Sequence, residues 1–171
     1  MDIIMNLFSY LKPGDFLYLD LLAAFTNALN GALLCQRPDH YKNHFVTTVG
    51  VLVFAVLGGI GGGVSRDVLV NDVPGALTNP WYLILVAIAW LIGLQTAWTK
   101  GQQFRETYFQ IMTSFSLPWY AVVGVEKGLS AGWPLLGAIA LGVVGPTAGR
   151  FLIDVASDVP AKQFVQGEWF I

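Results

Sequence analysis

The sequence predicts an all-α integral membrane protein built from inverted three-helix repeats, with glycine-broken second and fifth spans. Three observations predict this class: the composition, a series of apolar runs of membrane-crossing length, and an internal repeat. The mean hydropathy is +0.60 and only 12% of the residues are charged, whereas soluble domains average about 25% charged residues. A net charge of −2 without a basic patch gives no indication of a nucleic-acid partner.

Five apolar runs, each of roughly 18 to 26 residues, match the roughly 20 residues that a helix needs to cross the hydrocarbon. They predict spans over residues 16–34, 45–70, 81–98, 108–125 and 133–155. Short polar turns separate them, so we expect a single transmembrane domain over residues 1–171. Tryptophans lie at span ends, where indole rings favour the membrane–water interface: Trp81, Trp98, Trp133 and Trp169. Residues 164–171 resemble the opening of a sixth span.

The N-terminus and the cysteine content add two limits. The N-terminus lacks the positive start and the cleavage site of a secretory signal, and it predicts a retained interfacial segment. Cys35 is the one cysteine, which excludes an internal disulfide and leaves the redox compartment open.

The second predicted span contains a run of glycines that should break its helix. Glycine costs about 1 kcal/mol per helical position relative to alanine. The run consists of Gly58, Gly59, Gly61, Gly62 and Gly63 and is followed by Ser65, Arg66 and Asp67. Open backbone at membrane depth is tolerated only where protein buries it or where it lines a water-filled cavity. This pattern predicts a pathway through the membrane, although close helix packing also accounts for glycines in such helices.

An internal repeat appears at an offset of 86 residues without gaps. It relates Gly59 to Gly145, Gly63 to Gly149, Asn27 to Thr113, Asn30 to Ser116, and Asp72, Val73 and Pro74 to Asp158, Val159 and Pro160. A unit of three spans is odd, so the second copy must enter the membrane from the opposite face. We expect repeat one over residues 16–99 and an incomplete repeat two over residues 108–171. Inverted repeats with broken helices are typical of transporters with a central site.

The second copy carries its own helix-disrupting and charged residues. Pro146 removes an amide donor and predicts a kink. Arg150 lies two positions before the register partner of Arg66, and Asp154 lies one position after that of Asp67. We expect each arginine to neutralise its nearby acid or to bind freed backbone carbonyls, with snorkelling of Arg66 to the interface as a further alternative.

Polar residues form one face of the first and of the fourth span. Asp20, Asn27 and Asn30 share helical spacing, as do Gln110, Thr113 and Ser114. Asn27, Asn30, Thr113 and Ser114 are candidates for a polar lining. Hydrogen bonding between helices accounts for these residues as well as contact with water does.

The loop cations predict the orientation. Arg37, Lys42, Lys100, Arg105 and Lys162 lie on one side, and Lys12 and Lys127 on the other. The positive-inside rule places the larger group in the cytoplasm and the N-terminus outside.

Together these residues resemble the prokaryotic trimeric intracellular cation (TRIC) channels. The resemblance rests on Gly61-Gly62-Gly63-x-x-Arg66-Asp67, the Asp-Val-Pro turn, the repeated glycine-rich fifth span and the segment from Val159 to Phe170. It implies a homotrimer in the prokaryotic plasma membrane that conducts monovalent cations, chiefly potassium, through a pore within each subunit. It also implies seven spans, so we expect the natural gene product to continue for one or two more. Permeant K⁺ or Na⁺ and membrane lipid are the implied partners, with no further cofactor.

The predicted pathway comprises the residues around the two breaks. They are Gly58, Gly59, Gly61, Gly62, Gly63, Ser65, Arg66, Asp67, Gly145, Pro146, Gly149, Arg150 and Asp154. Two alternatives to a channel stay open: a secondary carrier of a small anionic or zwitterionic solute, with half-helix N-termini and arginines binding it, and a non-conducting scaffold. We expect no enzyme, because the sequence has no Gly-x-Ser-x-Gly or His-Glu-x-x-His motif. His40 and His44 lack a third metal ligand.

Overall fold

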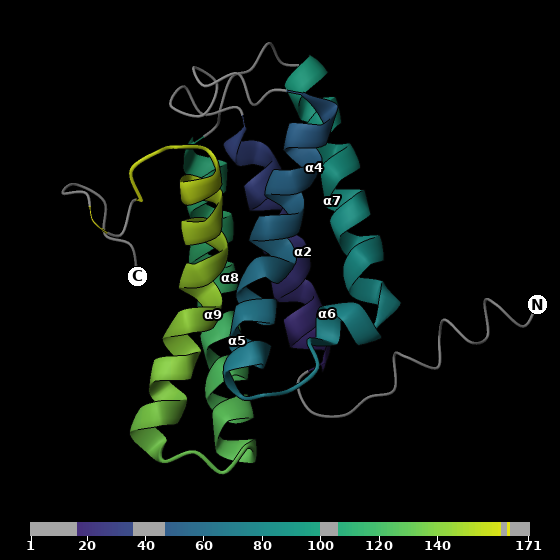
Figure 1. Cartoon of the computed structure of the whole chain (residues 1–171). Coiled ribbons are helices and arrows are strands. Elements are labelled where there is room, and N and C mark those ends of the chain that lie inside the picture. The colour runs from purple at the N-terminus through teal and green to yellow at the C-terminus, as the bar shows by residue number, and fades with distance from the viewer. Residues whose placement is uncertain (1–16, 36–46, 100–105, 162–163, 165–171) are drawn as a thin grey trace, which may run out of the picture.

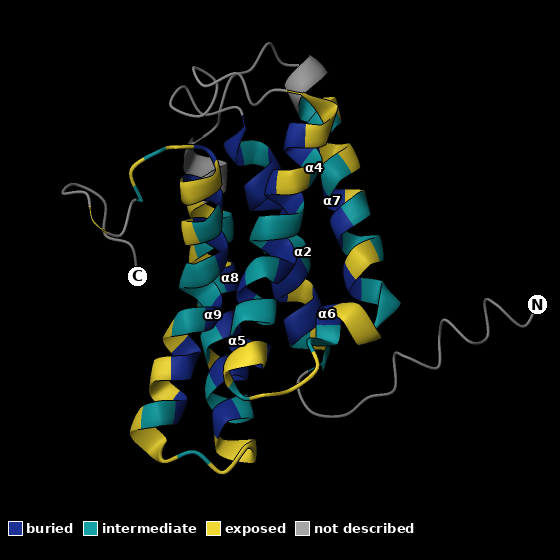
Figure 2. Ribbon diagram, viewed as in Figure 1, coloured by how far each residue is buried: buried dark blue, intermediate teal, exposed yellow. Residues whose placement is uncertain are grey.

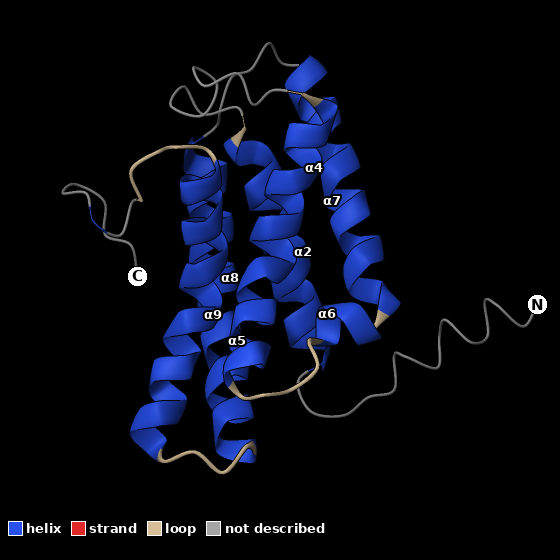
Figure 3. Ribbon diagram, in the orientation of Figure 1, coloured by secondary structure: helices blue, strands red, loops and turns tan. Residues whose placement is uncertain are grey.

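The computed structural model describes residues 17–35, 47–99, 106–161 and 164. In this part of the chain every regular element is a helix (Figure 3). The helices are α2 (Leu17–Leu34), α4 (Thr48–Val56), the π-helical turn η1 (Leu57–Gly61), α5 (Gly62–Leu69), α6 (Gly75–Thr78), α7 (Pro80–Thr99), α8 (Glu106–Ser130) and α9 (Leu135–Ala156). Each of the five predicted spans corresponds to helical structure, in α2, α4 to α5, α7, α8 and α9. The short helix α6 was not predicted.

Some predictions from the sequence fall on other parts of the chain. The interfacial N-terminal segment, the two loop histidines, the opening of a sixth span beyond Phe164 and all the loop cations except Lys127 lie outside the described residues. They stay predictions.

Three of these helices are long and apolar enough to cross a membrane by length and composition. They are Leu17–Leu34, Thr48–Leu69 and Leu135–Ala156. A shorter apolar helix covers Pro80–Thr96. Helix α8 is longer than the predicted fourth span, because it extends to Ser130 and includes the charged residues Glu126 and Lys127.

The expected break in the second span takes a milder form than an open backbone. The chain remains helical from Thr48 to Leu69, and the glycine run forms the π-helical turn η1 between two α-helical parts. A π turn costs less backbone hydrogen bonding than an open segment, and such turns often occur at functional sites. Helix α9 likewise continues through Pro146. Its interruption is therefore the amide that proline removes, not a gap in the helix.

Helix α2 occupies the centre of the molecule, with α4 and α7 on one side and α8 and α9 on the other (Figure 1). Small residues allow this close packing: Ala24, Ala28 and Ala32 of α2 are fully or almost fully buried. Exposed positions lie along the outer faces of the helices (Figure 2). Large apolar residues are among the exposed ones, including Val53, Leu91 and Val143. Such a surface suits contact with lipid, since a lipid tail is as apolar as leucine.

The two glycine-rich helices are equivalent in length and in how they end. Thr48–Leu69 and Leu135–Ala156 both contain 22 residues. Each is followed by a residue with positive φ, 56° at Asn71 and 54° at Asp158. These ends correspond at an offset of 87, one more than the offset of 86 that the sequence indicated. At this offset Asp67 and Asp154 occupy equivalent positions, so the predicted mismatch between the two acids disappears.

Candidate functional site

The glycine-rich helices cross each other through their backbones. A Cβ atom added to Gly62 would overlap the carbonyl oxygen of Gly145, and one added to Gly149 would lie 2.9 Å from the carbonyl oxygen of Leu57 and 3.1 Å from that of Gly58. At the offset of 87, Gly58 corresponds to Gly145 and Gly62 to Gly149. The contact of Gly62 with Gly145 is therefore matched by the contact of their counterparts, Gly149 and Gly58, as a twofold relation between the halves requires. These glycines allow the two helix backbones to approach closely.

The remaining glycines of the run are packed to different degrees. A Cβ atom on Gly59 would lie 2.6 Å from that of Ala28, whereas one on Gly61 would meet first the end of the Leu152 side chain, at 3.2 Å. A Cβ atom on Gly63 would make an ordinary contact of 3.7 Å with the Tyr120 hydroxyl. Ser65 turns back to the helix, where its hydroxyl donates to the carbonyl of Gly61 at 2.8 Å.

Helices α2 and α8 repeat the exchanged pairing with polar side chains. Asn30 Nδ2 donates to Thr113 Oγ1 at 3.0 Å, and Ser116 Oγ donates to Asn27 Oδ1 at 2.8 Å. Because Asn27 corresponds to Thr113 and Asn30 to Ser116, each residue contacts the counterpart of the other. These bonds hold the two halves together at the predicted polar faces.

One expected lining residue lies elsewhere. Ser114 and Gln110 are exposed on the outer side of α8. Ser116, two residues further, is fully buried instead. Positions two residues apart on an α-helix point about 200° away from each other, so Ser114 and Ser116 face opposite sides of α8.

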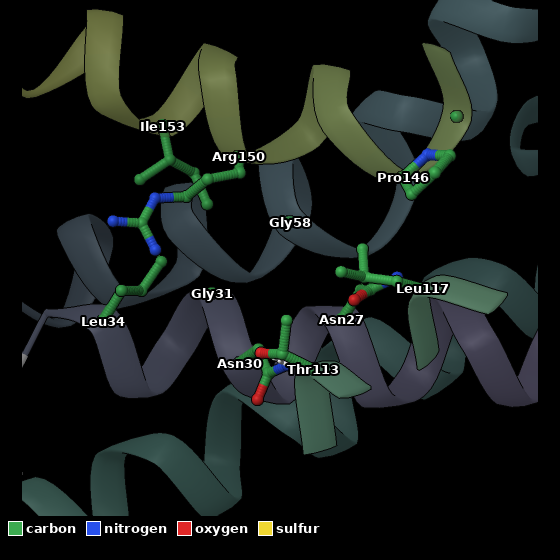
Figure 4. A pocket seen from close by; sticks show the side chains of 11 residues that line it. Asn27, Asn30, Gly31, Leu34, Gly58, Thr113, Leu117, Pro146, Arg150 and Ile153 are labelled. Carbon is green, nitrogen blue, oxygen red and sulfur yellow. Dashed lines mark hydrogen bonds between the residues drawn. The ribbon is translucent and has the colours of Figure 1, made fainter. Parts of the chain in front are cut away.

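A partly open cavity of about 40 Å³, lined mainly by apolar groups with a few polar side chains, lies between the glycine-rich helices and the α2–α8 pair (Figure 4). Its lining consists of Asn27, Asn30, Gly31, Leu34, Gly58, Thr113, Leu117, Gly145, Pro146, Arg150 and Ile153. Since one water needs roughly 10–15 Å³ on this measure, the cavity has room for two or three waters or a solute of similar size. In Figure 4 Arg150 extends from α9, and Asn30 and Thr113 lie together across from it.

Arg150 is the charged member of the cavity lining. Its Nε lies 2.7 Å from Oδ1 of Asp154, one helical turn away, and Asp154 is fully buried. Asn30 Oδ1 is buried and has no hydrogen-bond partner within the described residues. The cavity thus combines a guanidinium with amide and hydroxyl groups, and no carboxylate of the described residues lines it.

A second polar cluster surrounds Arg66, which is only 3% exposed and therefore does not snorkel. Its Nε lies 2.9 Å from Asp67 Oδ1, and its two Nη atoms each lie 3.3 Å from an oxygen of Asp20. Tyr82 donates its hydroxyl to Asp20 Oδ2 at 2.6 Å. The cluster leaves a space of only about 10 Å³, which is too small for more than a single water.

Lys127 joins this cluster to the surface of the protein. Its Nζ lies 2.9 Å from Asp67 Oδ1 and 3.0 Å from Asp72 Oδ2. Asp67 Oδ2 also accepts the backbone N–H of Gly75, at 2.9 Å. The Lys127 ammonium, followed by the N–H of Val73, holds the pKa of the exposed Asp72 below its ordinary value.

The structure therefore divides the predicted pathway residues between three places. Gly58, Gly145, Pro146, Arg150, Asn27, Asn30 and Thr113 line the cavity of about 40 Å³. Gly63, Arg66 and Asp67 line the small space around Asp20. Gly59, Gly62 and Gly149 pack helices together. The predicted Arg–Asp pairing is confirmed in both halves.

Sequence reasoning missed the partners that other helices supply. It placed Asp20 on the polar face of the first span but not beside Arg66, and it did not single out Tyr82, Tyr120 or Lys127 as partners. The spacing of seven between Asp20 and Asn27 indicated that Asp20 lies on the polar, inward face of its helix. No comparable pattern marks the two tyrosines. Among the described residues no group of three or more His, Cys, Asp or Glu side chains could hold a metal ion.

The fold and this site define an all-helical membrane protein with the fold of the TRIC channels. The structure superposes on a solved trimeric intracellular cation channel orthologue from Rhodobacter sphaeroides with a TM-score of 0.75 and 22% sequence identity, covering 89% of this chain and 75% of that one. The resemblance seen in the sequence is confirmed at the level of the fold. In sequence, a family model described as "Glycine transporter" matches residues 17–98.

Two curated relatives are both described as UPF0126 membrane proteins. The one from Streptomyces coelicolor is 37% identical over 78 residues, which cover 46% of this chain and 34% of the relative. The one from Deinococcus radiodurans is 28% identical over 152 residues, which cover 86% of this chain and 66% of the relative. The chain thus matches less than two thirds of the length of either relative.

Proposed function

We propose that this chain carries a small zwitterionic solute, of which glycine is the simplest, across the membrane through the cavity beside Arg150. The observation that carries the proposal is the cavity lining: the guanidinium of Arg150 faces amide and hydroxyl groups of Asn27, Asn30 and Thr113 without a carboxylate among them. The match to a family model described as a glycine transporter supports the same class.

The chemistry of the lining suits both ends of a zwitterion. A guanidinium offers five N–H donors in a planar fork, so Arg150 can remain paired with Asp154 through Nε and also receive a carboxylate. The buried Oδ1 of Asn30 is an acceptor for an ammonium group. Room for only two or three waters favours a solute without a long side chain.

Passive conduction of a monovalent cation, chiefly potassium, is the second candidate. The fold shared with a cation channel favours it, and so does the overall neutrality of the Arg150–Asp154 pair. A desolvated cation in the cavity would nonetheless face a guanidinium and no carboxylate from the described lining, which disfavours it there. In either case we propose a homotrimer in a prokaryotic plasma membrane, with contacts to lipid and with the N-terminus outside.

Flux into liposomes distinguishes the candidates. The full-length protein is reconstituted and tested with labelled glycine and, separately, with a potassium gradient. We expect saturable glycine uptake that is accelerated by glycine on the opposite side. Fast, non-saturating, electrogenic potassium flux without glycine uptake would replace this proposal by the channel, and the absence of both fluxes would favour a scaffold.

Two variants test Arg150 directly. Arg150→Met removes the carboxylate-binding group but also leaves buried Asp154 unpaired, so Arg150→Met with Asp154→Asn serves as the neutral control. We expect both to lose glycine uptake by at least about tenfold, the effect of one lost charged hydrogen bond. Recovery of uptake in the double variant would show that Arg150 only neutralises Asp154.

A further inference from the structure

The two glycine-rich helices differ at one point although their lengths and ends agree. Residues Leu57–Gly61 form a π turn, whereas α9 has no π segment at the equivalent place. Where a helix changes from π back to α hydrogen bonding, one backbone carbonyl is left without an amide donor from its own helix. A carbonyl buried in this way needs another donor.

Tyr120 of α8 supplies a donor inside the π turn. Its hydroxyl donates to the carbonyl oxygen of Gly59 at 2.6 Å, and the side chain is 2% exposed. The ring lies against two glycines: Cβ atoms on Gly62 and Gly145 would lie 3.4 Å and 3.3 Å from ring carbons, in close contact with it. The glycine crossing therefore brings this hydroxyl to the π turn.

We propose that Tyr120 is a positioning residue that holds the π turn and, through it, keeps Arg66 on Asp20. The α-helix turns by about 100° for each residue. If η1 relaxed to a regular α-helix, the part that follows would rotate by about that angle against Thr48–Val56. Arg66 lies little more than one turn beyond Gly61, so this rotation would take its guanidinium away from Asp20.

The contacts around Arg66 show what this rotation would change. The same small space is lined by Tyr120, Arg66, Asp20 and Tyr82. The larger cavity lies beside Arg150, so the protein around Arg66 is the more tightly closed of the two regions. Conversion of the π turn to an α-helix is then the movement that would enlarge the small space around Arg66. This consequence for transport rests on the proposed function, whereas the role of Tyr120 in the π turn does not.

The first experiment compares two tyrosine-to-phenylalanine variants by amide hydrogen exchange in the full-length protein. Tyr120→Phe removes the donor to Gly59. Tyr82→Phe is the matched control, because it removes a similarly buried hydroxyl that donates to Asp20 instead. We expect exchange over residues 61–66 to be about tenfold faster in Tyr120→Phe and to change less than about twofold in Tyr82→Phe. Unchanged exchange in Tyr120→Phe, or an equal increase in both variants, would overturn the proposal.

A graded change covers the case in which Tyr120→Phe does not fold. Difluorotyrosine placed at position 120 is a stronger hydrogen-bond donor, so exchange over residues 61–66 should become slower than in the wild type. Faster or unchanged exchange would count against Tyr120. If the wild-type protein carries neither glycine nor potassium, the proposed function fails, and the exchange measurements still decide the role of Tyr120.

Discussion

Arg66 balances two buried acids, Asp20 and Asp67. Arg66→Met leaves Asp20 without a cation and Asp67 with Lys127 as its remaining cation. We expect a loss of about 3–5 kcal/mol in the free energy of unfolding, as for other buried pairs that lose one partner. Thermal unfolding in detergent measures it.

The matched control for this prediction is Arg66→Met combined with Asp20→Asn. Removing one acid together with the guanidinium relieves part of the uncompensated charge, so the double variant should be more stable than Arg66→Met alone. A double variant that is no more stable would place the cost in lost packing.

Asp72 should make a pH-dependent contribution to stability. Its pKa is lowered in the folded protein from an ordinary value of 3.8, chiefly by Lys127. Above the ordinary pKa, Asp72 is ionised in both the folded and the unfolded chain, and its full contribution to stability is present. As the pH falls through the lowered pKa, both states become protonated and the contribution is lost. The stability difference between the wild type and Asp72→Asn should therefore vanish at strongly acidic pH.

Lys127→Met should have a larger effect than Asp72→Asn at neutral pH. Lys127 also neutralises Asp67, whose side chain is 2% exposed, whereas that of Asp72 is 56% exposed. Unfolding curves of the two variants at neutral pH provide the comparison. Equal losses would mean that Arg66 alone suffices to compensate Asp67.

At the scale of the helices, neighbouring glycines predict opposite results. Gly62→Ala places a methyl group against the carbonyl of Gly145, where backbone cannot yield easily. Gly63→Ala makes only an ordinary contact and gains up to about 1 kcal/mol of helix propensity. We expect Gly62→Ala to lower the unfolding temperature and Gly63→Ala to leave it unchanged or raise it. A similar loss in both would show that helix flexibility, not close packing, is what the glycines provide.

Helix positions were predictable because an apolar run that crosses a membrane must satisfy its backbone polar groups internally, which favours a helix. The state of the glycine run was not predictable. Propensity indicated a break at Gly58–Gly63, but packing against α2 and α9 holds the chain helical and reduces the break to a π turn. Tertiary contact outweighed local preference here, as it often does.

The pairing inside each half was visible in the sequence, while pairing between helices was not. Arg66 and Asp67 are neighbours, and Arg150 and Asp154 lie one turn apart. Asp20 lies 46 positions from Arg66, and Tyr82 lies 62 from Asp20. One sequence cannot reveal such distant contacts. The repeat gave an offset of 86, one residue less than the offset of 87 that relates the glycine-rich helices in the structure.

For the whole molecule, the arrangement predicts which segments share a membrane face. The α5–α6 connection and the α8–α9 turn lie at one end, and the C-terminal end of α9 lies at the other (Figure 1). Lys127 and Asp72 are in contact at that shared end. With Cys35→Ala as background, we expect Asp72→Cys and Gly132→Cys to react with an impermeant maleimide on intact cells, and Asp158→Cys to react only after the membrane is opened. The reverse pattern would invert the orientation predicted from the loop cations.

The two arginines reach equivalent acids from different turns of their helices. Asp67 is paired with the residue before it, while Asp154 is paired with a residue four positions earlier, whose counterpart in the first half is Gly63. Both halves pair the acid at the equivalent position, although the arginine that pairs with it comes from a different position. Gly63→Arg with Arg66→Leu would place the cation of the first half where the second half has it, so the half would still have a pair for Asp67 but Asp20 would lose its cation.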